Sequence, residues 1–237
     1  MLRYLDIEGA FNFRDIGGYP VEAAGLTSWG RLFRSGSLHN LSETSINRLH
    51  ALGLKTVIDL RTTREITERP DIVNGFDYHS LPVIEGQQEK ELAKSNKLTE
   101  HYKYMLENTQ PRLKTIFEHL ATLENSPVLV HCAAGKDRTG LVIALVLGNA
   151  GVADETIIED YALSDRYLDG FYKEAYEEAR QKGYDIVRYS NVLNSNSENM
   201  ANTITYLRER YGDFKGYLSA IGLSDETLDK LRNLIIN

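Results

Sequence analysis

The sequence predicts an α/β fold, with helices flanking a central, mostly parallel sheet. Two observations lead to this prediction: short apolar runs that suit buried strands, and amphipathic stretches between them that suit helices. The runs 55–60, 76–83 and 128–130 have the length and composition of strands. Because helices separate these runs, we expect parallel pairing, with any ligand bound at the carboxyl ends of the strands.

The helices can be placed in order by their caps and apolar faces. Ser42 caps a first helix that ends at Gly53 and turns three apolar residues inward: Ile46, Leu49 and Leu52. Two more helices follow over 99–108 and 111–123, the second with Pro111 at its first position. Its apolar stripe consists of Leu113, Ile116, Phe117, Leu120 and Leu123. After the strand 128–130 comes a stretch, 139–148, that is apolar on every side. It is shorter than the ~20 residues that span a bilayer, so we expect a buried helix.

The segment from about 154 to 211 looks like a helical elaboration of a single domain that covers residues 1–237. It is heavily charged and rich in tyrosine: Tyr161, Tyr167, Tyr172, Tyr176, Tyr184 and Tyr189. A loop of Asn and Ser, Ser190 to Asn199, interrupts it, and Ser197 can cap the next helix. The segment is either a lid beside the functional site or a helical pair that covers the sheet. Ser224 then opens a last helix, with Leu228, Leu231 and Ile235 facing inward.

Composition excludes several classes of function. The formal net charge of −7 argues against a nucleic-acid binder and against a polybasic grip on membranes, so we expect neither partner and no stable membrane insertion. The amino terminus lacks the apolar core of a signal peptide, and the single cysteine, Cys132, cannot form an intramolecular disulfide. We expect a cytoplasmic protein, although a secreted mature form would look the same.

The most informative segment is 131–140, His-Cys-Ala-Ala-Gly-Lys-Asp-Arg-Thr-Gly. A cysteine ends a strand, a loop follows, and an arginine and a threonine begin a helix. The helix directs its unpaired N–H groups and the positive end of its dipole at the loop, which favours an anion. Successive loop N–H groups can then surround three phosphoryl oxygens. We call residues 132–138 the phosphate loop; its predicted phosphate-binding residues are Ala133, Ala134, Gly135, Lys136, Asp137 and Arg138.

Each polar residue of this segment has an expected role. Cys132 becomes a nucleophilic thiolate, which cationic neighbours and helix N-termini favour. Arg138 binds two phosphoryl oxygens with its planar fork. Thr139 donates a hydrogen bond to the thiolate sulfur, and His131 orients the loop. The alternative, an inert buried Cys132, leaves Gly135 and the arginine unexplained.

These residues resemble the phosphate loop of cysteine-dependent phosphatases, in the version found in the bacterial and fungal tyrosine phosphatase family. Four further segments resemble motifs of that family: 12–19 (NFRDIGGY), 31–36 (RLFRSG), 57–61 (VIDLR) and the stretch from Tyr217 to Arg232. The resemblance implies a phosphatase-like fold and hydrolysis of phosphate monoesters without a metal or other cofactor. The substrates it implies are phosphotyrosine, phosphoserine or phosphothreonine, and phosphoinositides.

The general acid is harder to place. Many related phosphatases carry an Asp after a Trp-Pro pair, but Trp29 is followed by glycine. Asp137 is the first candidate, and the resemblance also places the acid there. Asp59, at a strand end, is the second candidate and Glu85 is the third.

Each of these assignments has a structural alternative. Asp137 could hold the loop or pair with Lys136, and Asp59 could pair with Arg61 or Arg14. Lys136 could contact a second phosphate or an inositol ring, or it could neutralise Asp137 and face water.

We therefore expect a phosphate-monoester hydrolase that acts through a phosphocysteine intermediate, most simply a protein-tyrosine or dual-specificity phosphatase. The catalytic residues are Cys132, Arg138 and Asp137, supported by His131, Thr139, Asp59 and Arg61. A phosphoinositide phosphatase and a non-catalytic phosphoresidue-binding module are the alternatives. The partner is accordingly a phosphorylated protein or a phosphoinositide.

Overall fold

The computed structural model describes residues 2–22, 25–123, 126–181, 183 and 195–236. Its centre is a five-stranded sheet in the order β1-β4-β7-β5-β6. The strands are β1 (Arg14–Asp15), β4 (Leu32–Ser35), β7 (Val128–His131), β5 (Thr56–Asp59) and β6 (Asp77–Ser80). Only the pairing of β1 with β4 is antiparallel within this sheet, which confirms the predicted α/β fold with a mostly parallel sheet.

The register of the three middle strands brings their carboxyl ends to one level. Ser35 of β4 and Asp59 of β5 both pair with His131 of β7, so the chain leaves all three strands at the same edge of the sheet. The strands 56–59 and 77–80 are shorter than the predicted runs. Strand β4, which the sequence marked only as a motif, is the neighbour that supports β7 on its other side.

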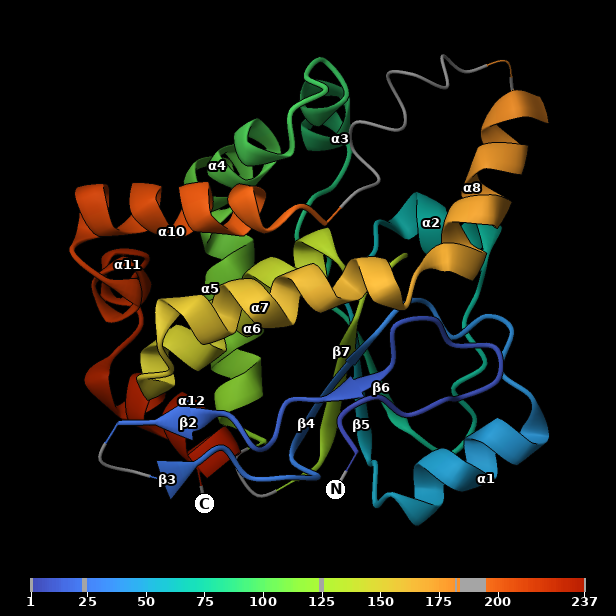
Figure 1. Cartoon of the computed structure of the whole chain (residues 1–237), viewed down its shortest axis with the longest axis horizontal. Coiled ribbons are helices and arrows are strands. Elements are labelled where there is room, and N and C mark those ends of the chain that lie inside the picture. The colour runs from blue at the N-terminus through green and yellow to red at the C-terminus, as the bar shows by residue number, and fades with distance from the viewer. Residues whose placement is uncertain (1, 23–24, 124–125, 182, 184–194, 237) are drawn as a thin grey trace.

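Helices cover both faces of the sheet (Figure 1). The alternation of side chains along the strands separates two cores: Leu129 and Val57 pack toward α1, while Val128 and Val130 pack toward the larger helical layer. The helices are α1 (Glu43–Ala51), α2 (Thr63–Glu68), α3 (Gln87–Leu92), α4 (Leu98–Asn108), α5 (Gln110–Ala121), α6 (Asp137–Ala150), α7 (Asp154–Arg166), α8 (Asp169–Gln181), α10 (Ser197–Tyr211), α11 (Phe214–Ala220) and α12 (Asp225–Ile236). A small hairpin, β2 (Pro20–Val21) and β3 (Gly25–Leu26), lies beside them.

Some helix ends match the sequence prediction and others differ. Ser42 caps α1 by accepting a hydrogen bond of 3.2 Å from the Ser45 amide. Pro111 occupies the second position of α5 and not the first, because Gln110 begins that helix. Asn196, not Ser197, caps α10: its side chain accepts from the Glu198 amide at 3.0 Å.

The predicted elaboration contains α7, α8 and α10. Helix α7 packs against α6 and α10, and so joins the main core. Tyr184, Tyr189 and the first half of the predicted Asn/Ser loop, residues 190–194, lie outside the described residues. Within α6, residues 139–147 are all buried, which confirms the buried helix predicted over 139–148. None of the described helices has the length and apolar character needed to cross a membrane.

Candidate active site

The phosphate loop leaves β7 after His131 and enters α6 at Asp137, which is the predicted strand–loop–helix arrangement. Cys132 is the first residue beyond the strand, and its side chain is 2% exposed at the base of a pocket. The positive end of the α6 dipole is directed at this loop. The site therefore places a sulfur atom beside an environment that favours anions.

Asn12 fastens the middle of the loop from behind. Its side-chain amide donates to the carbonyls of Ala134 and Gly135, each at 3.1 Å, while its Oδ1 accepts from Arg14. Asn12 is fully buried and adopts a left-handed backbone conformation, with φ of 58°. This conformation is uncommon for residues other than glycine, although Asn tolerates it better than most.

Two further donors complete the support. Arg34 Nη2 donates to the Gly135 carbonyl at 2.7 Å, and the Ser37 amide donates to the Ala133 carbonyl at 3.0 Å. The guanidinium of Arg34 is held in turn by the buried Asp160, with Nη1 2.5 Å from Oδ2. Burial opposes ionisation, but the positive charges of Arg34 and Arg14 lower the pKa of Asp160 below its ordinary value.

These bonds decide which way the loop amides point. In a planar trans peptide the carbonyl of one residue and the N–H of the next are directed to opposite sides. Because the carbonyls of residues 133–135 point back into the protein, the N–H groups of residues 134–136 point toward the pocket. The loop thus presents a row of donors of the kind that binds a tetrahedral anion.

Gly135 is required at its position for two reasons. Its φ is +67°, and a Cβ there would lie 2.2 Å from the carbonyl oxygen of Ser35. The loop can approach strand β4 this closely only without a side chain.

Arg138 is oriented by Glu65, a residue that the sequence analysis missed. Arg138 Nη1 and Nη2 donate to the two carboxylate oxygens at 2.6 and 2.8 Å. Glu65 also closes a capping box with Thr62 at the start of α2. Burial opposes the charge, but Arg138 lowers the pKa of Glu65 to about 2, and Glu65 in turn raises the pKa of Arg138. The Thr-x-x-Glu pattern was the available signal for this residue.

Asp137 and Lys136 lie next to each other where the phosphate loop enters α6. Asp137 Oδ1 accepts a hydrogen bond of 2.6 Å from the Tyr102 hydroxyl and lies 3.4 Å from Lys136 Nζ. The expected pair between the two residues is present. However, Lys136 is 1% exposed, so the expectation that it faces water is wrong. Both side chains line the pocket.

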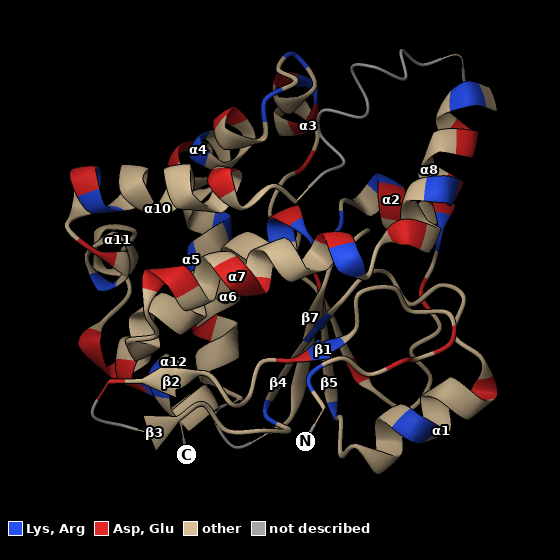
Figure 2. Ribbon diagram, in the orientation of Figure 1, with Lys and Arg blue, Asp and Glu red and all other residues tan. Residues whose placement is uncertain are grey.

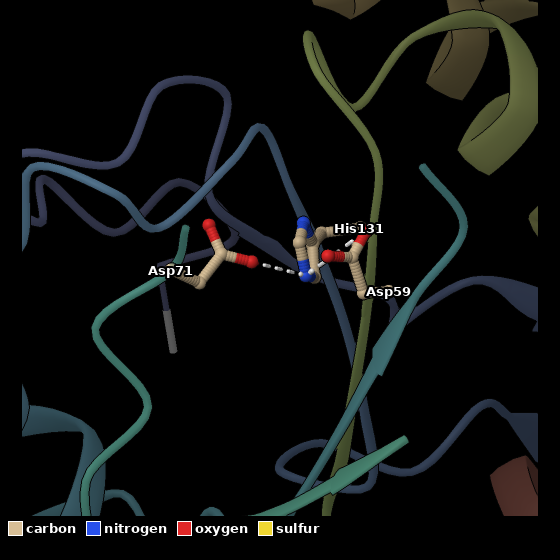
Figure 3. A group of neighbouring side chains, drawn as sticks. All are labelled: Asp59, Asp71 and His131. Atoms are coloured by element: carbon tan, nitrogen blue, oxygen red, sulfur yellow. Dashed lines mark ion pairs between the residues drawn. The ribbon is translucent and has the colours of Figure 1, made fainter. Parts of the chain in front are cut away.

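His131 belongs to a buried cluster beneath the loop (Figure 3). Its Nε2 lies 3.2 Å from Asp71 Oδ2 and 3.8 Å from Asp59 Oδ1. Burial opposes protonation, but the two carboxylates raise the pKa of His131. Asp71, in the coil after α2, was not predicted, because no sequence pattern marks it.

The same three side chains are close enough to suggest a metal site, since their ligand atoms lie within 4.8 Å of one another. Arg61 argues against this reading. Its Nη2 is 2.7 Å from Asp59 Oδ2 and 2.6 Å from Asp71 Oδ2. A guanidinium already neutralises both carboxylates, and a metal ion would have to displace it, so the donor set does not fit a metal.

Two of the three general-acid candidates lie away from the pocket. Asp59 is fully buried and pairs with Arg61, as its structural alternative predicted; Tyr78 also donates to it at 2.8 Å. Glu85 accepts a hydrogen bond of 3.1 Å from the amide of Thr63 at the start of α2. Of the candidates, Asp137 alone lines the pocket.

Thr139 does not make the expected hydrogen bond to the sulfur of Cys132. Its hydroxyl is buried, and within the part of the chain that the structure describes it has no hydrogen-bond partner.

The pocket over the phosphate loop has a volume of about 430 Å³. Its floor is formed by Cys132, Ala133, Ala134, Lys136, Asp137 and Arg138. Polar side chains also line it: Thr62, Arg64, Glu65, Glu89 and His101. The greater part of its lining surface is apolar and includes Ile84, Leu92, Leu98, Met105, Phe171 and Tyr172. The last two come from α8, so the helical elaboration borders the site as expected; its action as a lid stays a prediction. Arg69, just after α2, pairs with Glu178 of α8 at 2.6 Å, where Figure 2 shows acidic and basic residues on both helices.

Comparisons with known proteins show which family this chain resembles in sequence. The profile of the tyrosine phosphatase family matches residues 5–237. A tyrosine-protein phosphatase of Nostoc commune is 32% identical over 212 residues, which cover 84% of this chain and 72% of that protein. The triple specificity protein phosphatase PtpB of Mycobacterium tuberculosis is 28% identical and covers 98% of both chains. Among solved structures, P. aeruginosa TpbA has a TM-score of 0.42 and 17% identity, over 82% of this chain and 88% of its own.

Proposed function

Since the chain belongs to the tyrosine phosphatase family and is a cysteine-dependent phosphate-monoester hydrolase, we propose that Cys132, Arg138 and Asp137 carry out its reaction, with phosphotyrosine in proteins as the main substrate. The observation that carries the assignment is the orientation of the loop. Its amides point into a pocket whose floor holds the one cysteine of the chain and a fixed arginine.

In the first step the substrate phosphoryl group rests on the phosphate loop. The amides of residues 134–136 and the free edge of the Arg138 guanidinium hold its non-bridging oxygens. The Cys132 thiolate attacks phosphorus, a sulfur–phosphorus bond forms, and the bond from phosphorus to the ester oxygen breaks. Asp137 gives its proton to the departing oxygen, which leaves as a neutral phenol or alcohol.

In the second step water attacks the phosphocysteine. The Asp137 carboxylate accepts a proton from that water as the new oxygen–phosphorus bond forms and the sulfur–phosphorus bond breaks. Cys132 leaves as a thiolate and inorganic phosphate is released. The helix dipole and Arg138 favour the leaving thiolate in this step, as they favour the attacking one in the first.

The walls of the pocket support an aryl substrate. Above the charged floor the lining is mainly apolar, which suits a phenyl ring better than a polyhydroxylated inositol ring. The second candidate, a phosphoinositide, is favoured by Lys136, which adds a positive charge to the pocket beside those of Arg138 and Arg64. Its pairing with Asp137 weakens this case.

The test is phosphate release from a matched panel: a phosphotyrosine peptide, the corresponding phosphoserine peptide and a short-chain phosphoinositide. We expect the highest kcat/KM on the phosphotyrosine peptide and no turnover by Cys132→Ser on any substrate. A higher kcat/KM on the phosphoinositide would make it the main substrate, and activity that survives Cys132→Ser would overturn the assigned nucleophile.

A further inference from the structure

Two tyrosines that do not line the pocket are connected to Asp137. Tyr102 of α4 is 0% exposed, and its hydroxyl donates to Asp137 Oδ1 at 2.6 Å. The same hydroxyl lies 2.6 Å from the hydroxyl of Tyr161, which belongs to α7 and is 1% exposed. The two rings meet edge to face, with centroids 6.0 Å apart.

The direction of these bonds follows from what each group can donate. An ionised carboxylate only accepts, so the single proton of the Tyr102 hydroxyl is directed at Asp137. The Tyr161 hydroxyl must then donate to the oxygen of Tyr102. Burial and the charge of Asp137 raise the pKa of both phenols, which keeps both protonated and able to donate. The result is a buried chain of aligned donors that ends on one carboxylate oxygen.

The close packing of α7 on α6 allows this series of hydrogen bonds to form. A Cβ on Gly140, in the first turns of α6, would lie 3.1 Å from the ring of Tyr161. The glycine that ends the 131–140 segment thus lets α7 approach α6 closely enough for the Tyr161 hydroxyl to reach Tyr102.

Both of the contacts described for Asp137 involve the same oxygen. Tyr102 donates to Oδ1, and Lys136 Nζ lies 3.4 Å from Oδ1. A proton placed on Oδ1 would face these two donors, whereas a proton on Oδ2 leaves both contacts intact. Protonated Asp137 therefore carries its proton on Oδ2.

We propose that Tyr102, backed by Tyr161, is a positioning residue: it fixes the Asp137 carboxyl group so that Oδ2 carries the proton that is delivered to the leaving group. The inference rests on the proposed role of Asp137 as general acid. It assigns to Tyr102 no contact with substrate.

The experiment compares kcat/KM on two esters, because this parameter includes expulsion of the leaving group in the first step. Phosphotyrosine has a poor leaving group that needs protonation, whereas 4-nitrophenyl phosphate has an activated one that needs little. We expect Tyr102→Phe to lower kcat/KM about tenfold on a phosphotyrosine peptide and much less on the activated ester. Tyr161→Phe should show the same pattern with a smaller loss.

Tyr217→Phe is the matched control. Tyr217 is also 0% exposed, and its hydroxyl donates to the carbonyl of Leu106 on the same helix, α4, at 2.9 Å. The control removes an equally buried hydroxyl outside the site, so any loss that comes only from a loosened α4 should be equal on the two esters.

The double variant Tyr102→Phe/Asp137→Asn separates this inference from the assignment on which it rests. We expect Tyr102→Phe to cause no ester-dependent loss once Asp137 is Asn. If Asp137→Asn lowers kcat/KM more on the phosphotyrosine peptide than on 4-nitrophenyl phosphate but Tyr102→Phe does not, the positioning role is overturned and the general-acid role of Asp137 is kept. If Asp137→Asn lowers kcat/KM equally on both esters, the general-acid role fails, and the positioning role fails with it.

Discussion

Glu65 and Arg138 are joined by two N–H···O bonds of 2.6 and 2.8 Å, across the gap between α2 and the start of α6. The pair engages the ends of both Nη groups and leaves the Nε edge of the guanidinium available. The Arg138 side chain is therefore oriented before substrate binds. Glu65, which orients it, belongs to a capping box more than seventy positions earlier in the chain.

We expect Glu65→Ala to lower kcat/KM on a phosphotyrosine peptide at least tenfold, because Arg138 loses its orientation. The free energy of unfolding should also fall by about 1–2 kcal/mol, a value moderated by the partial exposure of the pair. Glu68→Ala is the control: Glu68 lies on the same helix, is exposed and reaches Arg64 only at 3.7 Å. Similar kinetics for the two variants would contradict the orienting role.

The ion pairs of Glu65 and Asp59 predict how stability depends on pH. The pKa values of Glu65 and Asp59 are each lowered to about 2 in the folded protein, from ordinary values of 4.5 and 3.8. A lowered folded-state pKa stabilises the protein above the unfolded-state pKa, and this contribution is lost as the pH falls through the folded-state value. We expect the free energy of unfolding to decline between about pH 4.5 and pH 2. Urea denaturation at several pH values across this window measures the decline in the free energy of unfolding. Glu65→Gln should make this decline shallower. Equal slopes of the free energy of unfolding against pH in the two proteins would exclude a contribution from Glu65.

Asn12 allows conformational strain and hydrogen bonding to be separated. Asn12→Ala removes both donors to the phosphate loop and keeps a Cβ at positive φ, whereas Asn12→Gly removes the donors and relieves the backbone. We expect both variants to lose about 1–3 kcal/mol of stability and most activity. The Asn12→Ala variant should have a free energy of unfolding lower than that of the Asn12→Gly variant by up to about 1 kcal/mol. Chemical denaturation gives the difference, and an active Asn12→Gly enzyme would show that the amide bonds are dispensable for turnover.

Gly135→Ala should abolish activity and lower stability by more than about 3 kcal/mol, since the new methyl group would meet the Ser35 carbonyl at 2.2 Å. Gly86→Ala is the control. Gly86 also has a positive φ, 60°, but nothing lies within 4 Å of its added Cβ. We expect a loss of only about 1 kcal/mol there, from backbone conformation alone. Thermal unfolding and phosphatase assays of the two variants make the comparison, and equal effects would show that close packing of the loop against β4 is unimportant.

The sequence predicted the parts of this protein that local chemistry determines. Apolar runs and caps located β5, β7, α1 and α6, and the spacing from Cys132 to Arg138 identified the loop. The order of the strands was not accessible, because it depends on how crossovers place β4 beside β7. Asp71 and Tyr102 were missed for a similar reason, and Glu65 was missed because its Thr-x-x-Glu pattern signals a helix cap but not the pairing with Arg138. Each acts on a partner more than thirty residues away, and no periodicity marks such contacts.

The support that Asn12, Arg34 and Ser37 give to the loop carbonyls forms when the protein folds, before any substrate arrives. The amide dipoles are then aligned in advance, and little binding energy is consumed in rearranging them. The same alignment does not distinguish a phosphoryl ester from free orthophosphate, which presents the same oxygens. The product is thus expected to occupy the site it leaves and to act as a competitive inhibitor of the enzyme.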